Sequence, residues 1–346
     1  MRTPSLSSAP TRLASAALVA ALALALAACG GTAPGAGDTG PGTERAATGA
    51  ATTAAASGSY TFTDDTGNSV TVNNPQRVVV GMGSLADIWR DAGGSFAGVS
   101  DDAFDNFGFD RSQVQSVGDH TNLSIEKILS VDPDFVILSG NADDDSSNKG
   151  PSQAQLKQAL EASGVTVAFF KVDTFDDYLR MLKTCTDITG RADLYKQNGT
   201  DVQGRVSQAL SQYSVAGDGA PTVLVMNASS KGVSAQKPDH MASEMVKALG
   251  AKLLTEENPS LLKDFSMEAV AELDPDYIFV LPAAKDDATA QRNYEKAVEG
   301  NAAWQGIGAV QRGHVTVLDI EHFFRKPNAE WDVAYETLGK ALKAAE

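Results

Sequence analysis

A fifteen-residue pattern occurs twice in this chain, and its two copies begin 142 positions apart. Residues 124–138 read SIEKILSVDPDFVIL and residues 266–280 read SMEAVAELDPDYIFV. Each copy predicts a capped helix, a turn at Asp-Pro-Asp and a buried strand. Two copies at this separation predict two similar α/β lobes and not an array of short repeats. Two lobes create a cleft between them, which is a common place for a small ligand to bind.

The residues of each copy explain this prediction. Ser124 is a good helix N-cap because its hydroxyl can accept a hydrogen bond from a free amide of the first turn. Asp132-Pro133 should end the helix, since the residue before a proline is disfavoured in the α region. The next run, residues 135–138, is continuously apolar, which is typical of a parallel strand covered on both faces. The second copy repeats these features at Ser266, at Asp274-Pro275 and in residues 277–280.

Glu126 and Glu268 occupy equivalent positions in the first helical turn of the two copies. Neither is at the capping-box position, which would be one residue later. One interpretation is an acidic residue that the helix dipole favours. The other is a matched pair of exposed carboxylates, one in each lobe, that could contact basic residues of a two-fold symmetric partner.

The N-terminus has the features of a bacterial export signal. Arg2 and Arg12 precede an apolar stretch that ends in Leu-Ala-Ala directly before Cys29. This ending resembles a lipobox, so residues 1–28 are predicted to be a lipoprotein signal peptide and Cys29 the lipidated first residue. Two alternatives are a plain secretory signal with an incidental cysteine and a transmembrane anchor, for which the apolar stretch is short.

Residues 29–59 are rich in Gly, Ala, Thr and Ser and contain almost no large apolar side chain. Such a segment cannot bury enough surface to fold, so it predicts a flexible tether. A tether would give a lipid-anchored protein reach from the cell membrane on its extracytoplasmic side.

The mature chain would be strongly acidic. Loss of Arg2 and Arg12 with the leader leaves 26 basic against 44 acidic residues, a net charge of −18. This sign argues against nucleic acid and anionic lipid surfaces as partners. Besides Cys29 only Cys185 remains, which leaves no pair for an intramolecular disulfide. Cys185 shares an apolar helical face with Tyr178 and Leu182, so it is predicted to be buried packing.

Strand and helix patterns alternate on both sides of a helical middle section. This alternation predicts a mostly parallel sheet in each lobe. In the middle, two helical patterns follow one another with no strand between them. The predicted fold class is α/β, with two similar lobes, a helical spine and a ligand cleft between the lobes. The predicted domains are residues 60–175 (N-terminal lobe), 176–215 (connector and spine helices) and 216–346 (C-terminal lobe).

Further motifs accompany the repeat. A hairpin pattern in residues 63–72 is followed by Pro75-Gln76-Arg77-Val78-Val79, and Val117-Gly118-Asp119 leads into the first copy. NAAW at residues 301–304 and AVQRGHV at 309–315 follow the second copy. With this order and spacing, the chain from about Tyr60 to its end resembles the substrate-binding lipoproteins of bacterial ABC importers for iron–siderophore, heme and cobalamin.

The resemblance implies two α/β lobes joined by a rigid helical spine, with a shallow cleft that closes little. The spine maps to residues 191–213, where Gly199 and Gly204 are a departure, because glycine is unfavourable inside a helix. By motif position, Glu126 and Glu268 would engage basic residues of a permease dimer, which works with its ATPase. The implied protein is a monomeric binding component, not an enzyme, and reaches the membrane only through its lipid anchor.

In lobes of this kind, ligands contact the loops that follow the carboxyl ends of the strands. The predicted loops include residues 101–109, 226–236 and 321–326. The candidate ligand-binding residues are Met82, Ser84, Phe104, Phe107, Phe109, Lys171, Lys237, His240, His322, Arg325 and Lys326. The three phenylalanines, Phe104, Phe107 and Phe109, form either a stacking surface for a planar ligand or a small satellite core. Arg325 and Lys326 either suit an anionic aromatic chelate or are a solvated basic pair.

A direct metal site is not predicted. The four histidines do not pair at metal-ligand spacing, and Asp143-Asp144-Asp145 lacks the glycine and terminal glutamate of a calcium loop. The cargo is therefore expected to be a chelated metal or an organic ligand, without a resident cofactor. A ferric siderophore leads, with hydroxamates preferred over highly anionic catecholates because few cleft residues are basic. Heme and cobalamin remain alternatives.

Two other function classes have weaker support. A surface enzyme would be expected to carry a recognisable motif, but no nucleophile elbow, zinc-histidine motif or kinase set occurs. A two-lobed metallocluster oxidoreductase would need several cysteine thiolates.

Overall fold

A computed structural model describes residues 58–140 and 152–344, which belong to one compact unit. The predicted signal peptide, Cys29, most of the predicted tether and Asp143-Asp144-Asp145 lie outside the described residues. Within the described part, no helix is both long enough and apolar enough to cross a membrane.

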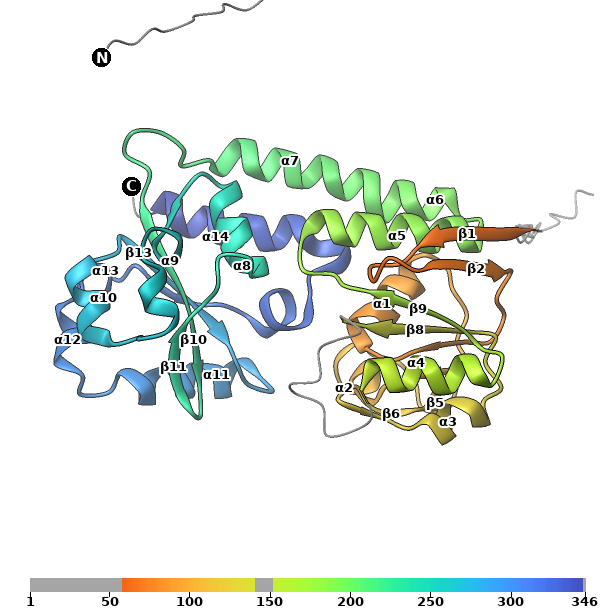
Figure 1. The fold of residues 1–346 in the computed structure, drawn as a ribbon. Coiled ribbons are helices and arrows are strands. Elements are labelled where there is room, and N and C mark those ends of the chain that lie inside the picture. The colour runs from red at the N-terminus through yellow and green to blue at the C-terminus, as the bar shows by residue number, and fades with distance from the viewer. Residues whose placement is uncertain (1–57, 141–151, 345–346) are drawn as a thin grey trace, which may run out of the picture. The chain divides into compact units, whose positions relative to one another are not determined.

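Two sheets form the centres of two lobes, and their main strands lie in the same order (Figure 1). The strands of the first are β3 Val78–Val80, β4 Gly98–Val99, β5 Gln115–Ser116, β8 Phe135–Ser139 and β9 Thr166–Phe170; those of the second are β10 Thr222–Ser229, β11 Gly232–Ala235, β12 Lys252–Leu253, β13 Tyr277–Pro282 and β14 Val315–Val317. The first sheet is parallel, in the order β5-β4-β3-β8-β9. In the second, parallel pairing gives β12-β10-β13-β14. The predicted α/β architecture of two similar lobes is therefore confirmed.

Helices flank these sheets, and two small antiparallel pairs complete the first lobe. The pairs are β1 Ser59–Thr63 with β2 Ser69–Asn73, and β6 Gly118–Asp119 with β7 Asn122–Leu123. The first-lobe helices are α1 Gly83–Asp91, α2 Asp101–Asn106, α3 Ile125–Ser130 and α4 Gln153–Ala162. Those of the second are α8 Met241–Ala248, α9 Leu254–Glu257, η2 Pro259–Leu262, α10 Met267–Leu273, α11 Asp287–Val298, α12 Ala302–Gly306 and α13 Gly308–Gln311.

Alternate residues of the central strands face different apolar clusters, as expected for parallel strands covered on both sides. In β8, Phe135 and Ile137 belong to a large core that also contains Val223 and Phe279 of the second lobe. Val136 faces a separate cluster of the first lobe. The other face of the second sheet has its own cluster in the same way. One continuous core thus spans both lobes.

Both copies of the sequence repeat fold as predicted. Ser124 accepts a hydrogen bond from the amide of Lys127 at 3.3 Å, and Ser266 accepts one from Ala269 at 3.1 Å. α3 and α10 end before the Asp-Pro pairs, where Asp132 and Asp274 adopt left-handed backbone angles with φ of 48° and 41°. Aspartate tolerates this region better than most residues.

The last aspartate of each copy fastens its strand to the neighbouring one. The Asp134 carboxylate accepts hydrogen bonds from the backbone amides of Gln76 and Arg77, at 2.8 and 3.0 Å, just before β3. Asp276 accepts from the amide of Thr222, at 2.8 Å, where β10 begins. The repeat therefore sets the alignment of the two central strands in each sheet.

The predicted spine is continuous, with one irregular turn. It consists of α6 Ala192–Tyr195, a π-helical turn η1 Lys196–Thr200 and α7 Asp201–Tyr213, preceded by α5 Phe175–Thr189. Gly199 lies in the π turn, where an added Cβ would come within 3.0 Å of the Tyr195 ring. The glycine thus accommodates a close contact and does not end the helix.

A second helix runs beside the spine. The terminal helix α14 Trp331–Ala344 packs along α7 (Figure 1). Its first residue, Trp331, is buried against Phe175 and Tyr178 of α5, with ring centroids 5.5 and 6.4 Å apart. Asp332 forms an ion pair with Arg205 of α7 at 2.7 Å. The chain thus connects the two lobes through packed helices as well as through the spine itself.

Two predicted loops are wrong. Residues 226–236 form the end of β10 and the strand β11, an antiparallel hairpin whose alternation was too short to recognise in the sequence. Residues 101–106 form α2, so Phe104 is helical. Cys185, in contrast, is fully buried on α5 as predicted, and burial raises the pKa of its thiol.

Trp331→Ala should lower the free energy of unfolding by about 3–5 kcal/mol, because it leaves a cavity between α14 and α5. Denaturant unfolding of the soluble protein measures this. Trp331→Phe should cost much less, since the indole N–H has no partner among the described residues. Val333→Ala, at an exposed position two residues on, should change little. Equal losses for Trp331→Ala and Val333→Ala would contradict the role given to this packing.

Candidate ligand-binding site

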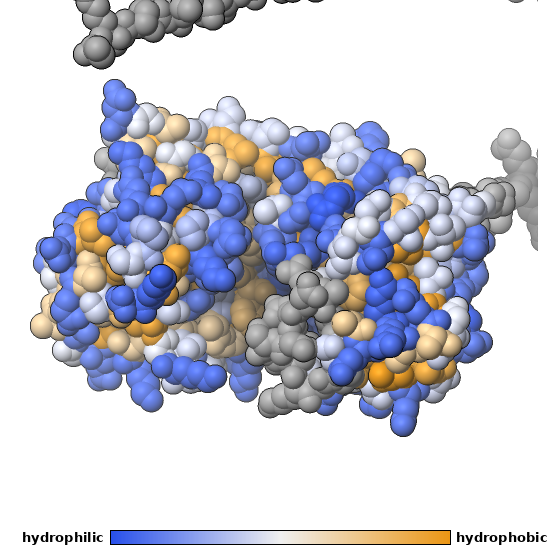
Figure 2. Space-filling model, in the orientation of Figure 1, coloured by the Kyte–Doolittle hydropathy of each residue, from blue (hydrophilic) through white to orange (hydrophobic). Residues whose placement is uncertain are grey.

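A cavity of about 260 Å³ lies where strands of both lobes end. Lys171 follows β9 of the first lobe, and the segments after β11 and β14 supply the second-lobe side. Its lining residues are Lys171, Asp173, Gln236, Lys237, Asp239, His240, Met241, Phe323, Phe324 and Lys326. Ligands of α/β sheets bind at the carboxyl ends of strands, so this is the candidate ligand site. Hydrophilic residues cover most of the face shown in Figure 2.

The structure brings four of the predicted ligand residues together here: Lys171, Lys237, His240 and Lys326. A neighbouring cavity of about 190 Å³ contains Phe107 and His322, and Lys326 lines both. Lys326 is therefore the residue that connects the two groups of candidates.

Asp173, which the sequence did not single out, joins two of the lysines. Its carboxylate lies 2.8 Å from the Lys171 ammonium and 3.3 Å from that of Lys326, which comes from the other lobe. Burial opposes ionisation of Asp173, but the two ammonium groups outweigh it and hold the pKa of this carboxyl below its ordinary value. The hydrogen bond with Asp173 raises the pKa of Lys171. Asp173 and Lys171 are therefore both charged at neutral pH.

His240 is a neutral member of the site. It is the N-cap of α8, and its Nδ1 accepts a hydrogen bond from the amide of Ala242 at 3.2 Å. An accepting Nδ1 places the ring proton on Nε2. Burial, assisted by the positive charge of Lys326, lowers the pKa of His240 to about 4.

The segment after β14 has an unusual backbone. Residues Glu321–Arg325 form a π-helical turn, η3, and Lys326 then adopts a φ of 104°, which is rare for a side chain of this size. π turns and such backbone angles are concentrated at functional sites. In this turn Phe323 is buried, whereas Phe324 is 60% exposed and lines the cavity. Phe324 was missed because two adjacent phenylalanines do not reveal which one faces the core.

Several predicted candidates have other contacts. The guanidinium of Arg111 lies over the Phe104 ring and that of Arg90 over the Phe109 ring, and both rings pack on the core. These two contacts favour the satellite-core interpretation for Phe104 and Phe109.

Met82 and Ser84 begin α1, and Ser84 is buried. The Ser84 carbonyl accepts from Asn328, which also donates to Asp87. Arg325 pairs with Glu321 in its own turn at 2.7 Å. His322 lies between Asp319 and Glu330, at 2.7 and 3.2 Å, and the Asp319 hydrogen bond raises its pKa. These groups hold the segment after β14 in place.

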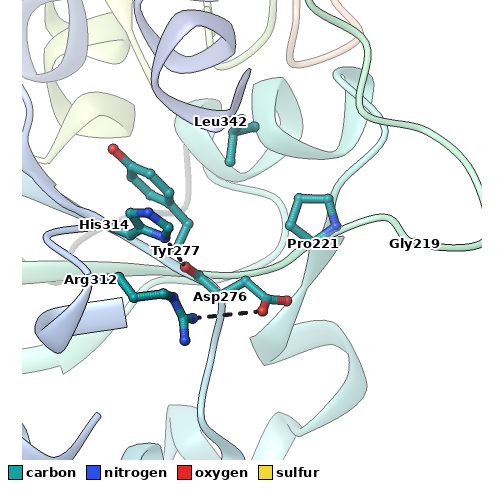
Figure 3. A pocket seen from close by; sticks show the side chains of 7 residues that line it. All are labelled: Gly219, Pro221, Asp276, Tyr277, Arg312, His314 and Leu342. Atoms are coloured by element: carbon teal, nitrogen blue, oxygen red, sulfur yellow. Dashed lines mark hydrogen bonds and ion pairs between the residues drawn. The ribbon is translucent and has the colours of Figure 1, made fainter. Parts of the chain in front are cut away.

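A further cavity, of about 200 Å³, lies at the opposite ends of the second-lobe strands. There Tyr277 and His314 stack with ring centroids 5.6 Å apart, and Arg312 approaches Asp276 (Figure 3). The His314 Nδ1 contacts the backbone oxygen of Asp276. Because the cavity is at the amino ends of the strands, it is not the candidate ligand site.

Known proteins share this arrangement. The family model described as "Periplasmic binding protein" matches residues 78–321, which include both sheets. The chain belongs to the periplasmic binding protein family. YhfQ of Bacillus subtilis (strain 168), provisionally named an ABC transporter substrate-binding lipoprotein, is 23% identical over 273 residues, which cover 74% of this chain and 80% of YhfQ.

Solved periplasmic binding proteins have the same fold. The petrobactin-binding protein YclQ from Bacillus subtilis aligns with a TM-score of 0.62 at 19% identity, covering 83% of this chain and 98% of YclQ. The vitamin B12 binding protein BtuF of Vibrio cholerae aligns with a TM-score of 0.61 at 20% identity, covering 79% of this chain and 98% of BtuF. Siderophore and cobalamin binders thus share this fold.

We expect His240 to make the free energy of unfolding depend on pH. Its folded pKa lies below the unfolded value of about 6.5, so its contribution is present above that pH and is lost as pH falls toward 4. Between pH 7 and 4.5 the native protein should lose about 2 kcal/mol more than His240→Asn, which keeps an N-cap but cannot titrate. His322, whose pKa is raised, changes the free energy of unfolding in the opposite direction. Its contribution is the same in the native protein and in His240→Asn, so it cancels in the comparison. Identical pH profiles would show that His240 is not buried in the neutral form.

Proposed function

We propose that this periplasmic binding protein is the extracytoplasmic, lipid-anchored binding component of an ABC importer, and that its cargo is a chelated metal, in the first place a ferric siderophore. The observation that supports it is the cavity at the strand ends, which combines an exposed aromatic ring, Phe324, with three lysines. Rings and ammonium groups recognise the organic shell of a chelate.

The histidines favour a chelate over a metal bound to the protein. Within the described residues, no group of three or more His, Cys, Asp or Glu side chains could hold an ion. A metal-ligating histidine usually donates its other ring N–H to an acceptor. The Nδ1 of His240 instead accepts, and both ring nitrogens of His322 face carboxylates. Heme, whose iron can take methionine or tyrosine as well as histidine, remains an alternative beside cobalamin.

The proposed contact with the permease uses Glu126 and Glu268. Both side chains are exposed in the first turns of α3 and α10, at equivalent positions of the two lobes. A permease dimer presents two equivalent basic sites, so one carboxylate per lobe matches its symmetry. The protein would act as a monomer with Cys29 carrying the lipid. A surface enzyme remains the other class, and turnover by the purified protein would favour it.

A chelate panel should identify the cargo. Purified protein starting at Gly31 is melted with ferric hydroxamates, ferric catecholates, cobalamin, heme and free ferric ion. A ligand present at a hundred times its dissociation constant adds about 2.7 kcal/mol, which raises Tm by several degrees. We expect a shift with a ferric siderophore and none with the free ion. A shift with free ferric ion alone would contradict the chelate proposal.

Glu126→Ala with Glu268→Ala should abolish uptake while leaving the affinity for the cargo unchanged, because these carboxylates lie outside the cavity. Uptake by cells lacking the native protein and cargo binding by the purified variant measure the two effects. Glu161→Ala with Glu299→Ala, two exposed glutamates on other elements of the two lobes, serves as the control. Normal uptake by the first double variant would exclude the docking roles.

A further inference from the structure

The cavity at the strand ends carries a positive charge in a chain that is strongly negative. Three lysines and two aspartates line it, and His240 is neutral, which leaves the lining residues with a formal charge of +1. Carboxylates outnumber cations in two adjoining cavities, the one that contains His322 and a second one lined by Lys171 and Arg180. One of those cavities shares Lys171, Asp173 and Asp239 with this one, so an anion is favoured here by direct contact with the ammonium groups and not by the surrounding field.

The three ammonium groups are not fully neutralised by the protein. Lys171 and Lys326 share the single carboxylate of Asp173. Lys237 is exposed and has no ion-pair partner among the residues that the structure describes. Asp239 lines the same cavity, but its carboxylate is not within ion-pair distance of any of the three ammonium groups. One further anionic oxygen would complete the charge balance of this group.

The Asp173 contacts are suited to exchange. The side chain of Lys171 is half exposed and that of Asp173 is 39% exposed. The pair with Lys171 should therefore contribute only about 0–1 kcal/mol. The Lys326 side chain is 22% exposed, so a ligand carboxylate that replaces Asp173 there has to restore a charge partner for its ammonium group. Lys326 is held from the other side by its backbone, with a φ of 104°, between η3 and the buried Asn328. Its ammonium is thus positioned in advance.

We propose that Lys171 and Lys326, one from each lobe, bind a carboxylate group of the cargo in exchange for Asp173, with Lys237 at the rim. The site would thereby select chelates with one free carboxylate over forms in which that carboxylate is esterified or absent. This inference rests on the proposed function and specifies its substrate class. Phe324 would pack against the body of the chelate, adjacent to the ammonium pair. Because the two lysines belong to different lobes, the carboxylate would replace an inter-lobe ion pair with an inter-lobe bridge through the cargo.

The test compares matched pairs of chelates that differ in one carboxylate. The probes are a linear ferric trihydroxamate succinylated or acetylated at its free amine, a ferric catecholamide as free acid or methyl ester, a cobalamin monocarboxylate or cobalamin, and the monomethyl or dimethyl ester of heme. Dissociation constants are measured with the soluble protein. For the framework that binds, we expect the carboxylate form to bind about tenfold more tightly.

The variants separate charge recognition from structural effects. Lys171→Met with Lys326→Met should remove the advantage of the carboxylate form, so that both members of a pair bind with the same affinity. Lys196→Met, which removes a lysine paired with Asp201 on the spine, should keep the advantage. Asp173→Asn should tighten the carboxylate form by about three- to tenfold, because no protein carboxylate then competes. Melting curves confirm that each variant folds.

Each outcome of these measurements either supports or overturns the carboxylate inference. Equal binding of both members of a pair, or an advantage that survives the double lysine variant, overturns this inference and leaves the proposed function standing. Weaker binding of both forms by Asp173→Asn also overturns it, because Asp173 would then be structural. If no pair binds, the proposed function fails for these cargoes and the inference fails with it.

Discussion

The burial of Trp331 between the terminal helix and α5 is the contact on which the candidate site depends. The cavity is formed by side chains from both lobes, so its shape is defined only if the lobes keep one arrangement. Trp331 packs against Phe175 and Tyr178 in a core that continues into both sheets. Just before it, Asn328 donates to Ser84 and Asp87 of the first lobe. A spine helix alone could bend; a spine helix with a second helix packed along it resists bending.

This packing also explains the backbone after β14. The chain must leave the second sheet, cross toward α1 and enter α14 within the thirteen residues between β14 and α14. The π turn η3, the left-handed angle of Lys326 and the buried Asn328 accomplish this crossing. Phe324 and the Lys326 ammonium are directed to the cavity as a consequence. A conformation that costs energy locally is thus maintained by the apolar core on which α14 lies.

Sequence patterns could predict what depends on neighbours along the chain. The Ser caps, the Asp-Pro ends and the apolar runs of the repeat all act within fifteen residues, and all were predicted correctly. Four cavity residues were also among the predicted candidates. Lys171 and Lys326 come after parallel strands, whereas Lys237 and His240 follow the antiparallel strand β11. The pairing of Asp173 with Lys326 could not be predicted, since 153 positions separate them and their contact depends on how the lobes pack. The hairpin of β10 and β11 was missed because its second strand is only four residues long.

The two lobes are alike where a symmetric partner would need them to be, and they differ where a ligand would bind. Glu126 and Glu268 lie on α3 and α10, which are corresponding helices that precede corresponding strands. The cavity instead uses the β10–β11 hairpin and the π turn η3, which have no counterpart among the described residues of the first lobe. A cargo is rarely two-fold symmetric, so its site has to break the symmetry of the repeat. Docking and recognition could therefore vary independently: changes in the hairpin or in η3 would alter the cargo without disturbing the paired glutamates.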